Sequence, residues 1–224
     1  MNATLKVTIE LNSGGLSLMR FGDYARAVTF LQQALEHLET FFPYDFLGDE
    51  EIMQDDLPIE ASPSLVGPHA SHCHDETVIG IFDRGFFFSG DDLPIAMGSA
   101  CVRLYVSIAI HYNLALCMHM QALLKPRDQS LLLEKAKSIY QMACGLLDST
   151  MDQPEALLHH FALVNNLASV SAQLCEMQDA KRWLEDLRFV YWSDADALDE
   201  EERITFRTNL LTNLWYTTRP AAAA

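Results

Sequence analysis

The sequence predicts an all-α protein, and three observations support this fold class. Outside residues 43–98, apolar side chains recur at the three- and four-residue spacing of helices. Alanine or glycine recurs inside these apolar stripes, where two helices can cross closely. Five of the eight prolines and six of the ten glycines fall within 43–98, so residues that break helices are scarce elsewhere. We therefore expect helical blocks separated by one irregular segment.

The 224 residues, half of them hydrophobic, are enough to bury the core of one domain. We expect this single domain (1–224) to contain five parts in order. These are repeat 1 (2–42), an acidic insert (43–98), repeat 2 (99–148), repeat 3 (154–191) and a capping helix or half-repeat (199–216).

Charge and cysteine content restrict the class of function. The formal net charge is −16, and the insert alone, with 12 acidic residues and one basic residue, accounts for −11 of it. Nucleic acid and anionic membrane surfaces would be repelled, whereas a basic or neutral protein partner would not. The five cysteines are an odd number with no CxxC pair, and the N-terminus lacks the layout of a signal peptide. The expected location is therefore the cytoplasm or nucleus.

The insert has two different halves. Residues 43–76 are predicted to be a long irregular loop. Residues 77–89 (TVIGIFDRGFFFS) contain two β-branched or aromatic runs around Asp83, Arg84 and Gly85, which predict either a small hairpin or one extended strip. In both cases the phenylalanines of this stretch need to be covered by other residues.

Repeat 1 carries a recognisable spacing of small and apolar residues: Gly15, Gly22, Tyr24, Ala27, Leu31 and Ala34 follow the pattern Gly-x6-Gly-x-Tyr-x2-Ala-x3-Leu-x2-Ala. This resembles the tetratricopeptide (TPR) repeat, a pair of antiparallel helices. Gly15 and Ala27 allow the helices to approach closely, and Gly22 suits the turn between them.

The pattern returns twice. In repeat 3, six residues occupy the same spacing: Ala168, Cys175, Met177, Ala180, Leu184 and Leu187. In repeat 2 the second helix matches through Ala136, Tyr140 and Ala143, but 21 positions separate Ala115 from Ala136, which predicts longer helices or a longer turn. The resemblance implies a TPR-like superhelix of antiparallel helix pairs.

The resemblance also implies a concave groove lined by the first helix of each pair. Asn113, Asn166 and Asn209 occupy one place in three successive first helices, and an amide there can pair with both the N–H and the C=O of an extended peptide. Tyr112 and His119 are further candidates for the groove. The alternative is that the asparagines make interhelical hydrogen bonds that fix packing. The family's clamp for acidic chaperone tails is disfavoured, because Asn166 stands where such clamps carry a basic residue.

The chain itself also supplies a candidate occupant of this groove. The aromatic stretch Phe82 to Phe88 precedes repeat 2 closely enough for a high local concentration near the groove. The alternative is that these aromatics cap the exposed edge of repeat 1.

Catalytic and metal motifs are not found. GxxxxGK[ST], GxGxxG, GxSxG and HExxH are all missing, so we expect no enzyme and no cofactor. The cluster HASHCHD (His69 to Asp75) is the basis of the alternative reading as a metal-binding protein or enzyme, but it lacks a second pair of ligands, and we expect no metal. The apolar stretch Leu104 to Leu124 is expected to be a buried helix, because its polar residues are costly in a bilayer. The prediction is a non-catalytic protein–protein interaction module or scaffold.

Overall fold

A computed structural model of the chain describes residues 3–41, 64–66, 80–88, 100–147, 156–218. The described part is all-α apart from two three-residue strands, as predicted. The helices are α1 (Ala3–Arg20), α2 (Tyr24–Phe41), α3 (Ala100–Leu124), α4 (Gln129–Leu147), α5 (Ala156–Gln173), α6 (Met177–Asp194) and α7 (Glu200–Thr218). A short 3₁₀ turn, Ala195–Ala197, lies between α6 and α7.

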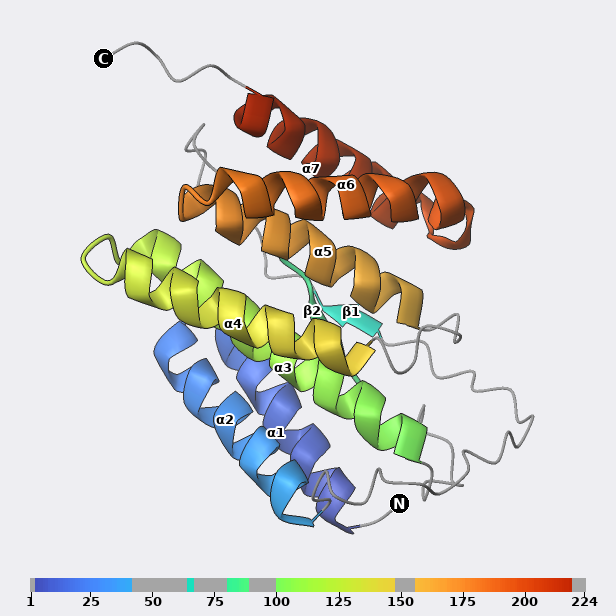
Figure 1. The fold of residues 1–224 in the computed structure, drawn as a ribbon. Coiled ribbons are helices and arrows are strands. Elements are labelled where there is room, and N and C mark those ends of the chain that lie inside the picture. Colours follow the sequence, from blue (N-terminus) through green and yellow to red (C-terminus); the bar gives the residue numbers. More distant parts are fainter. Residues whose placement is uncertain (1–2, 42–63, 67–79, 89–99, 148–155, 219–224) are drawn as a thin grey trace.

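The helices form three consecutive antiparallel pairs that stack in chain order, with α7 at the end of the stack (Figure 1). Each odd-numbered helix packs on the next odd-numbered helix, and each even-numbered helix packs on the pair that follows. The core is therefore continuous from α1 to α7, as in arrays in which each unit buries its neighbour.

Helix α3 is the centre of the molecule. It packs against α1, α2, α4 and α5 and against the second strand, and every residue from Tyr105 to His119 is buried. This surrounding by protein explains why its sequence is apolar on all sides. None of the described helices is both long enough and apolar enough to cross a membrane.

Small residues lie where the helices of a pair cross. Ala27, Ala136 and Ala180 are fully buried, as the sequence predicted. A Cβ atom added to Gly15 would lie 2.8 Å from Cγ of Leu31, closer than real side chains approach. The close crossing predicted for repeat 1 is therefore present.

The turns of the first and third pairs have the same hydrogen bonds. In the first, Gly22 N–H donates to Met19 O and the next residue donates to Leu18 O; in the third, Cys175 N–H donates to Ala172 O and the next residue donates to Ser171 O. Both Gly22 (φ 75°) and Cys175 (φ 61°) adopt the left-handed conformation that ends helices. Cys175 is exposed. The left-handed turn position explains its exposure.

The second pair differs from the first mainly in helix length. Its turn (125–128) is one residue longer than the turn at 21–23, and its helices extend about one further turn on each side of it. The long spacing between Ala115 and Ala136 therefore reflects longer helices.

The two strands are β1 (Ser64–Val66) and β2 (Gly85–Phe87), which pair antiparallel with Leu65 opposite Phe86. The strand partner of 85–87 is thus 64–66, so the alternative of a hairpin closed around Asp83 to Gly85 was wrong, and the alternative of one extended strip holds for residues 80–88. The chain does not turn back at Asp83 to Gly85, because its main chain is hydrogen-bonded to α5 at Phe82 and to α3 at Phe86. Most of the predicted insert, including His69 to Asp75, lies outside the described residues.

Candidate functional site

The candidate site is the contact between the odd-numbered helices and residues 80–88, which we call the threaded segment. It runs extended from Gly80 to Phe88 and lies between α3, α5 and α7 on one side of the stack (Figure 1). Phe82 and Phe86 have no exposed surface. These two side chains therefore lie inside the molecule.

Asn113 on α3 binds the main chain of Phe86 in two directions. Its Oδ1 accepts the Phe86 N–H at 2.8 Å, and its Nδ2 donates to the Phe86 carbonyl oxygen at 2.8 Å. Asn12 on α1 donates to the same carbonyl at 3.1 Å and accepts a hydrogen bond from Asn113 at 2.9 Å. A carboxamide satisfies both groups of one peptide residue in this way, as another strand would.

Asn166 on α5 repeats the arrangement four residues earlier. Its Oδ1 accepts the Phe82 N–H at 2.8 Å, and its Nδ2 lies 3.0 Å from the Phe82 carbonyl oxygen. Nδ2 also lies 3.0 Å from the Tyr112 hydroxyl and 3.1 Å from the Tyr140 hydroxyl. Tyr112 donates its own hydroxyl proton to the Phe82 carbonyl at 2.8 Å, and burial raises the pKa of Tyr112 well above 10, so that this donor stays protonated.

The end of the segment at Gly80 lies against α5 and α7. Asn165 and Asn213 donate to the Gly80 carbonyl oxygen at 3.3 Å and 3.2 Å. Asn209 is buried and close to Gly80, but its Nδ2 has no hydrogen-bond partner within the described part of the chain. Each odd-numbered helix thus contributes at least one asparagine, and we call the whole set the asparagine row. Its members are Asn12, Asn113, Asn165, Asn166, Asn209 and Asn213.

The side chains of the threaded segment occupy defined positions. Phe82 stacks on Phe206 of α7, with ring centroids 4.6 Å apart. Phe86 stacks on His159 at 3.9 Å and meets Tyr112 edge-on at 4.8 Å. Such aromatic pairs add to the stability gained from burial.

Arg84 and Asp83, between the two phenylalanines, are partly buried. Arg84 forms an ion pair with Glu201 of α7. Burial raises the pKa of the Asp83 carboxyl, although a hydrogen bond from its own backbone and the neighbouring charge of Arg84 act in the opposite direction. Partial burial therefore disfavours the ionised form of the Asp83 side chain.

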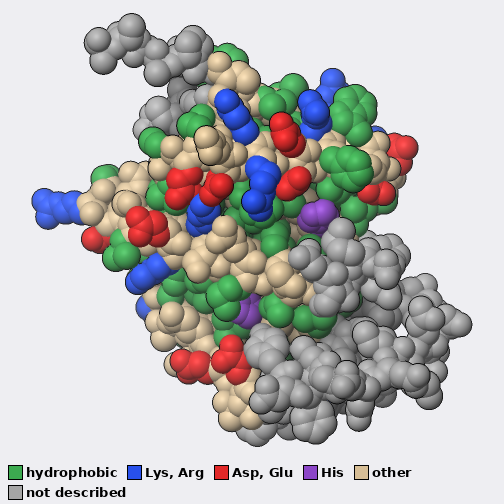
Figure 2. Space-filling view, in the orientation of Figure 1, with side chains coloured by type: hydrophobic (Ala, Val, Ile, Leu, Met, Phe, Trp, Pro, Cys, Tyr) green, Lys and Arg blue, Asp and Glu red, His purple; other side chains and the backbone are tan. Residues whose placement is uncertain are grey.

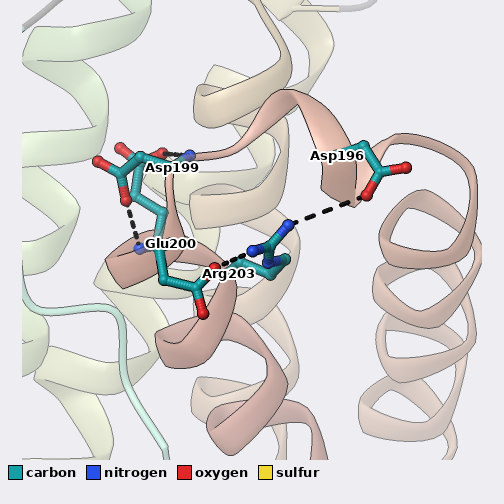
Figure 3. A network of polar contacts seen from close by, with 5 residues as sticks. Asp196, Asp199, Glu200 and Arg203 are labelled. Atoms are coloured by element: carbon teal, nitrogen blue, oxygen red, sulfur yellow. Dashed lines mark hydrogen bonds and ion pairs between the residues drawn. The ribbon is translucent and has the colours of Figure 1, made fainter.

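The start of α7 is fixed by its own polar contacts, drawn in Figure 3. Asp199 accepts the Glu202 N–H at 2.7 Å, and Glu202 accepts the Asp199 N–H at 3.1 Å, which is a reciprocal capping box. Arg203 forms ion pairs with Glu200 and, at 3.9 Å, with Asp196. This anchored end places Glu201 beside Arg84.

The structure brings Asn113, Asn166 and Tyr112 together on the threaded segment, and it places Asn209 beside Gly80. His119 lies elsewhere: it is fully buried, its Nε2 accepts a hydrogen bond from Nε2 of Gln173 at 2.9 Å, and its ring meets the ring of Tyr140. The contacts described for His119 are to helices α4 and α5. Burial lowers its pKa to about 4.

Sequence reasoning missed Asn12, Asn165, Asn213 and His159. Asn12 lies three residues before Gly15, whereas Asn113 and Asn166 lie two residues before their alanines, so a search at fixed spacing passes over it. Asn213 lies one helical turn after Asn209, and that i,i+4 relation was a usable signal.

Metal ligands are not grouped in the described residues, where no three His, Cys, Asp or Glu side chains are placed to hold an ion. On the face shown in Figure 2, lysine and arginine side chains lie among aspartates and glutamates. Comparison with protein-family models, with curated proteins and with solved structures gives no match to this chain.

Proposed function

We propose that this chain is a non-catalytic protein-interaction module with a TPR-like arrangement of helices, and that the asparagine row holds an extended polypeptide of a partner by its main chain. One observation carries the proposal: Asn166 bonds to both the N–H and the C=O of Phe82, and Asn113 bonds to both the N–H and the C=O of Phe86. At each of these residues both the N–H and the C=O are bonded, as they are when an extended peptide is held by its main chain.

Three further features support this reading. The contacted residues, 80, 82 and 86, are all even-numbered, so one edge of an extended chain faces the helices, as in strand addition. The row runs through α1, α3, α5 and α7, the helices expected to line the concave side. The net charge of −16 favours a basic or neutral partner.

A peptide experiment tests the proposal. The probe is a labelled peptide with the sequence of residues 80–88, and the receiving protein is the Phe82→Ala variant, whose own segment is weakened. We expect the peptide to bind in a fluorescence anisotropy titration. Adding Asn113→Ala and Asn166→Ala to the same variant should reduce the affinity at least about tenfold, since two main-chain hydrogen-bond pairs are lost.

The matched control is the same peptide methylated on the Phe82 and Phe86 nitrogens, which keeps the side chains and removes the two N–H donors. Equal binding of the methylated peptide would contradict the proposal. If circular dichroism shows that Phe82→Ala is unfolded, Gly80→Ala replaces it, because its added Cβ would lie 2.8 Å from Cα of Asn209 and weaken the segment at one end. A folded variant that leaves the peptide unbound at millimolar concentration would also contradict the proposal.

A further inference from the structure

We propose that the threaded segment is an intramolecular competitor, and that the partner which replaces it carries an extended segment of the form Gly-x-Phe-x-(Arg or Lys)-Gly-Phe with a neutral residue in place of Asp83. This inference rests on the proposed function and specifies the partner and the regulation of the same site. Each position of the pattern follows from a contact of the threaded segment.

The two glycines are required by space. A Cβ at position 80 would lie 2.6 Å from Oδ1 and 2.8 Å from Cα of Asn209, and the second of these is backbone that cannot move aside. A Cβ at position 85 would collide with Cδ2 of Leu16 and lie 3.2 Å from Oδ1 of Asn113. A larger residue at either position would push the main chain away from the asparagines.

The two phenylalanines are required by the aromatic contacts. The ring of Phe82 lies on Phe206, and the ring of Phe86 lies between His159 and Tyr112. The main chain carries no sequence information, so these two rings and the two glycines give the specificity. Phenylalanine four residues apart also matches the spacing of Asn166 and Asn113.

Charge distinguishes the two central positions. Position 84 lies beside Glu201, with which Arg84 forms an ion pair, so a basic residue is favoured there. Position 83 disfavours charge, because the Asp83 side chain is partly buried and forms no ion pair within the described residues. Burial accordingly raises the pKa of its carboxyl. The chain's own segment therefore fits the site less well than a segment with a neutral residue at that position.

Because Asp83 fits the site less well than a neutral residue would, a partner's segment can replace the threaded segment. A segment tethered to its own site competes at an effective concentration in the millimolar range. A partner's apparent affinity equals its intrinsic affinity multiplied by the fraction of molecules whose site is free. A segment that binds its own site less than optimally can be replaced by a better one, and the site then remains closed to sequences that lack the pattern.

The test measures the affinity of each of four peptides for each of two proteins. The peptides have the sequence of residues 80–88, either unchanged or with Asp83→Asn, Arg84→Glu or Gly85→Ala, and the proteins are the unmodified chain and Phe82→Ala. We expect the Asp83→Asn peptide to bind measurably more tightly than the unchanged peptide, because the amide carries no charge into the partly buried position. We expect Arg84→Glu and Gly85→Ala each to weaken binding at least about tenfold. The unmodified chain should bind every peptide at least about tenfold more weakly than Phe82→Ala.

The outcomes separate the two proposals. If the unmodified chain and Phe82→Ala bind the unchanged peptide equally, the segment is no competitor, although the proposed function stands. If neither binds any peptide, the proposed function fails as well. If Asp83→Asn binds no better than the unchanged peptide, or if the unmodified chain forms a dimer by exchanging its own segment, the inferred foreign partner is wrong. Should Phe82→Ala be unfolded, Gly80→Ala serves in its place.

Discussion

At the scale of single residues, asparagine is the side chain that matches a peptide group. Its amide presents one acceptor and one donor at the separation of a backbone N–H and C=O, which Asn113 and Asn166 use on Phe86 and Phe82. A buried peptide group that loses such a partner keeps the full cost of its lost hydration. The asparagines are therefore expected to contribute to stability as well as to binding.

Replacing Asn166 with alanine tests this expectation. The Phe82 N–H then has no partner among the described contacts, and the free energy of unfolding should fall by about 2–3 kcal/mol. Asn165→Ala is the matched control, because the Gly80 carbonyl still accepts from Asn213, and it should cost about 1 kcal/mol or less. Urea unfolding measures both, and equal losses would contradict the role assigned to Asn166.

The pH dependence of stability should report on His119. Its pKa is lowered by burial to about 4, whereas its ordinary value is 6.5. Between these pH values the unfolded chain binds one proton more than the folded chain, so the free energy of unfolding falls as the pH falls below 6.5. The loss reaches about 3 kcal/mol by pH 4.

His119→Gln removes this titration and keeps a polar group beside Gln173. Urea unfolding at several pH values between 7 and 4.5 should show a shallower decline for the variant than for the unmodified chain. His111, whose pKa burial also lowers, contributes to the decline that remains. Parallel curves for the two proteins would show that His119 is not the buried neutral group described.

At the scale of secondary structure, α7 determines one end of the site. Its residues Phe206, Asn213 and Glu201 contact the threaded segment, and its first turn is fixed by the Asp199 capping box (Figure 3). Among the described helices, α7 packs mainly on α5 and α6, so it has fewer helix neighbours than α3. Its N-terminal cap therefore matters for the site.

Asp199→Ala should lower the free energy of unfolding by about 1 kcal/mol, because the cap hydrogen bond is lost. Asp196→Ala is the control, since Asp196 is fully exposed and its ion pair with Arg203 at 3.9 Å contributes little. Thermal unfolding of both variants makes the comparison. A larger effect from Asp196 would contradict the assignment of the cap to Asp199.

The positions of the helices and the faces that they bury were predictable from the sequence. The contacts of the threaded segment were predictable only in part. Periodic alanines report burial, and Ala27, Ala136 and Ala180 are buried as expected. The repeated asparagines indicated an extended ligand, and Phe82 to Phe88 were a candidate occupant. Periodicity does not say which group a buried polar residue binds, so the position of His119 and the part played by Asn12 did not follow. The pairing of 64–66 with 85–87 is a long-range contact that local pattern leaves undetermined.

At the scale of the whole molecule, the stack of helix pairs and the threaded segment form one core. Residues 80–88 form hydrogen bonds with α1, α3, α5 and α7. A segment from the middle of the chain therefore connects the first and last described helices of the stack. Removal of this segment would leave buried amides without partners along the row. A partner segment that supplies the same peptide groups restores them, which is the physical basis of the proposed exchange.

The most direct test of this account is amide hydrogen exchange measured by NMR at Phe82 and Phe86. If Asn166 and Asn113 bind these main-chain groups, both amides should exchange at least about 100-fold more slowly than in an unstructured peptide. Asn166→Ala should remove the protection at Phe82, and Asn113→Ala should remove it at Phe86. Exchange at the unstructured rate in the unmodified chain, with the helices still protected, would contradict the account.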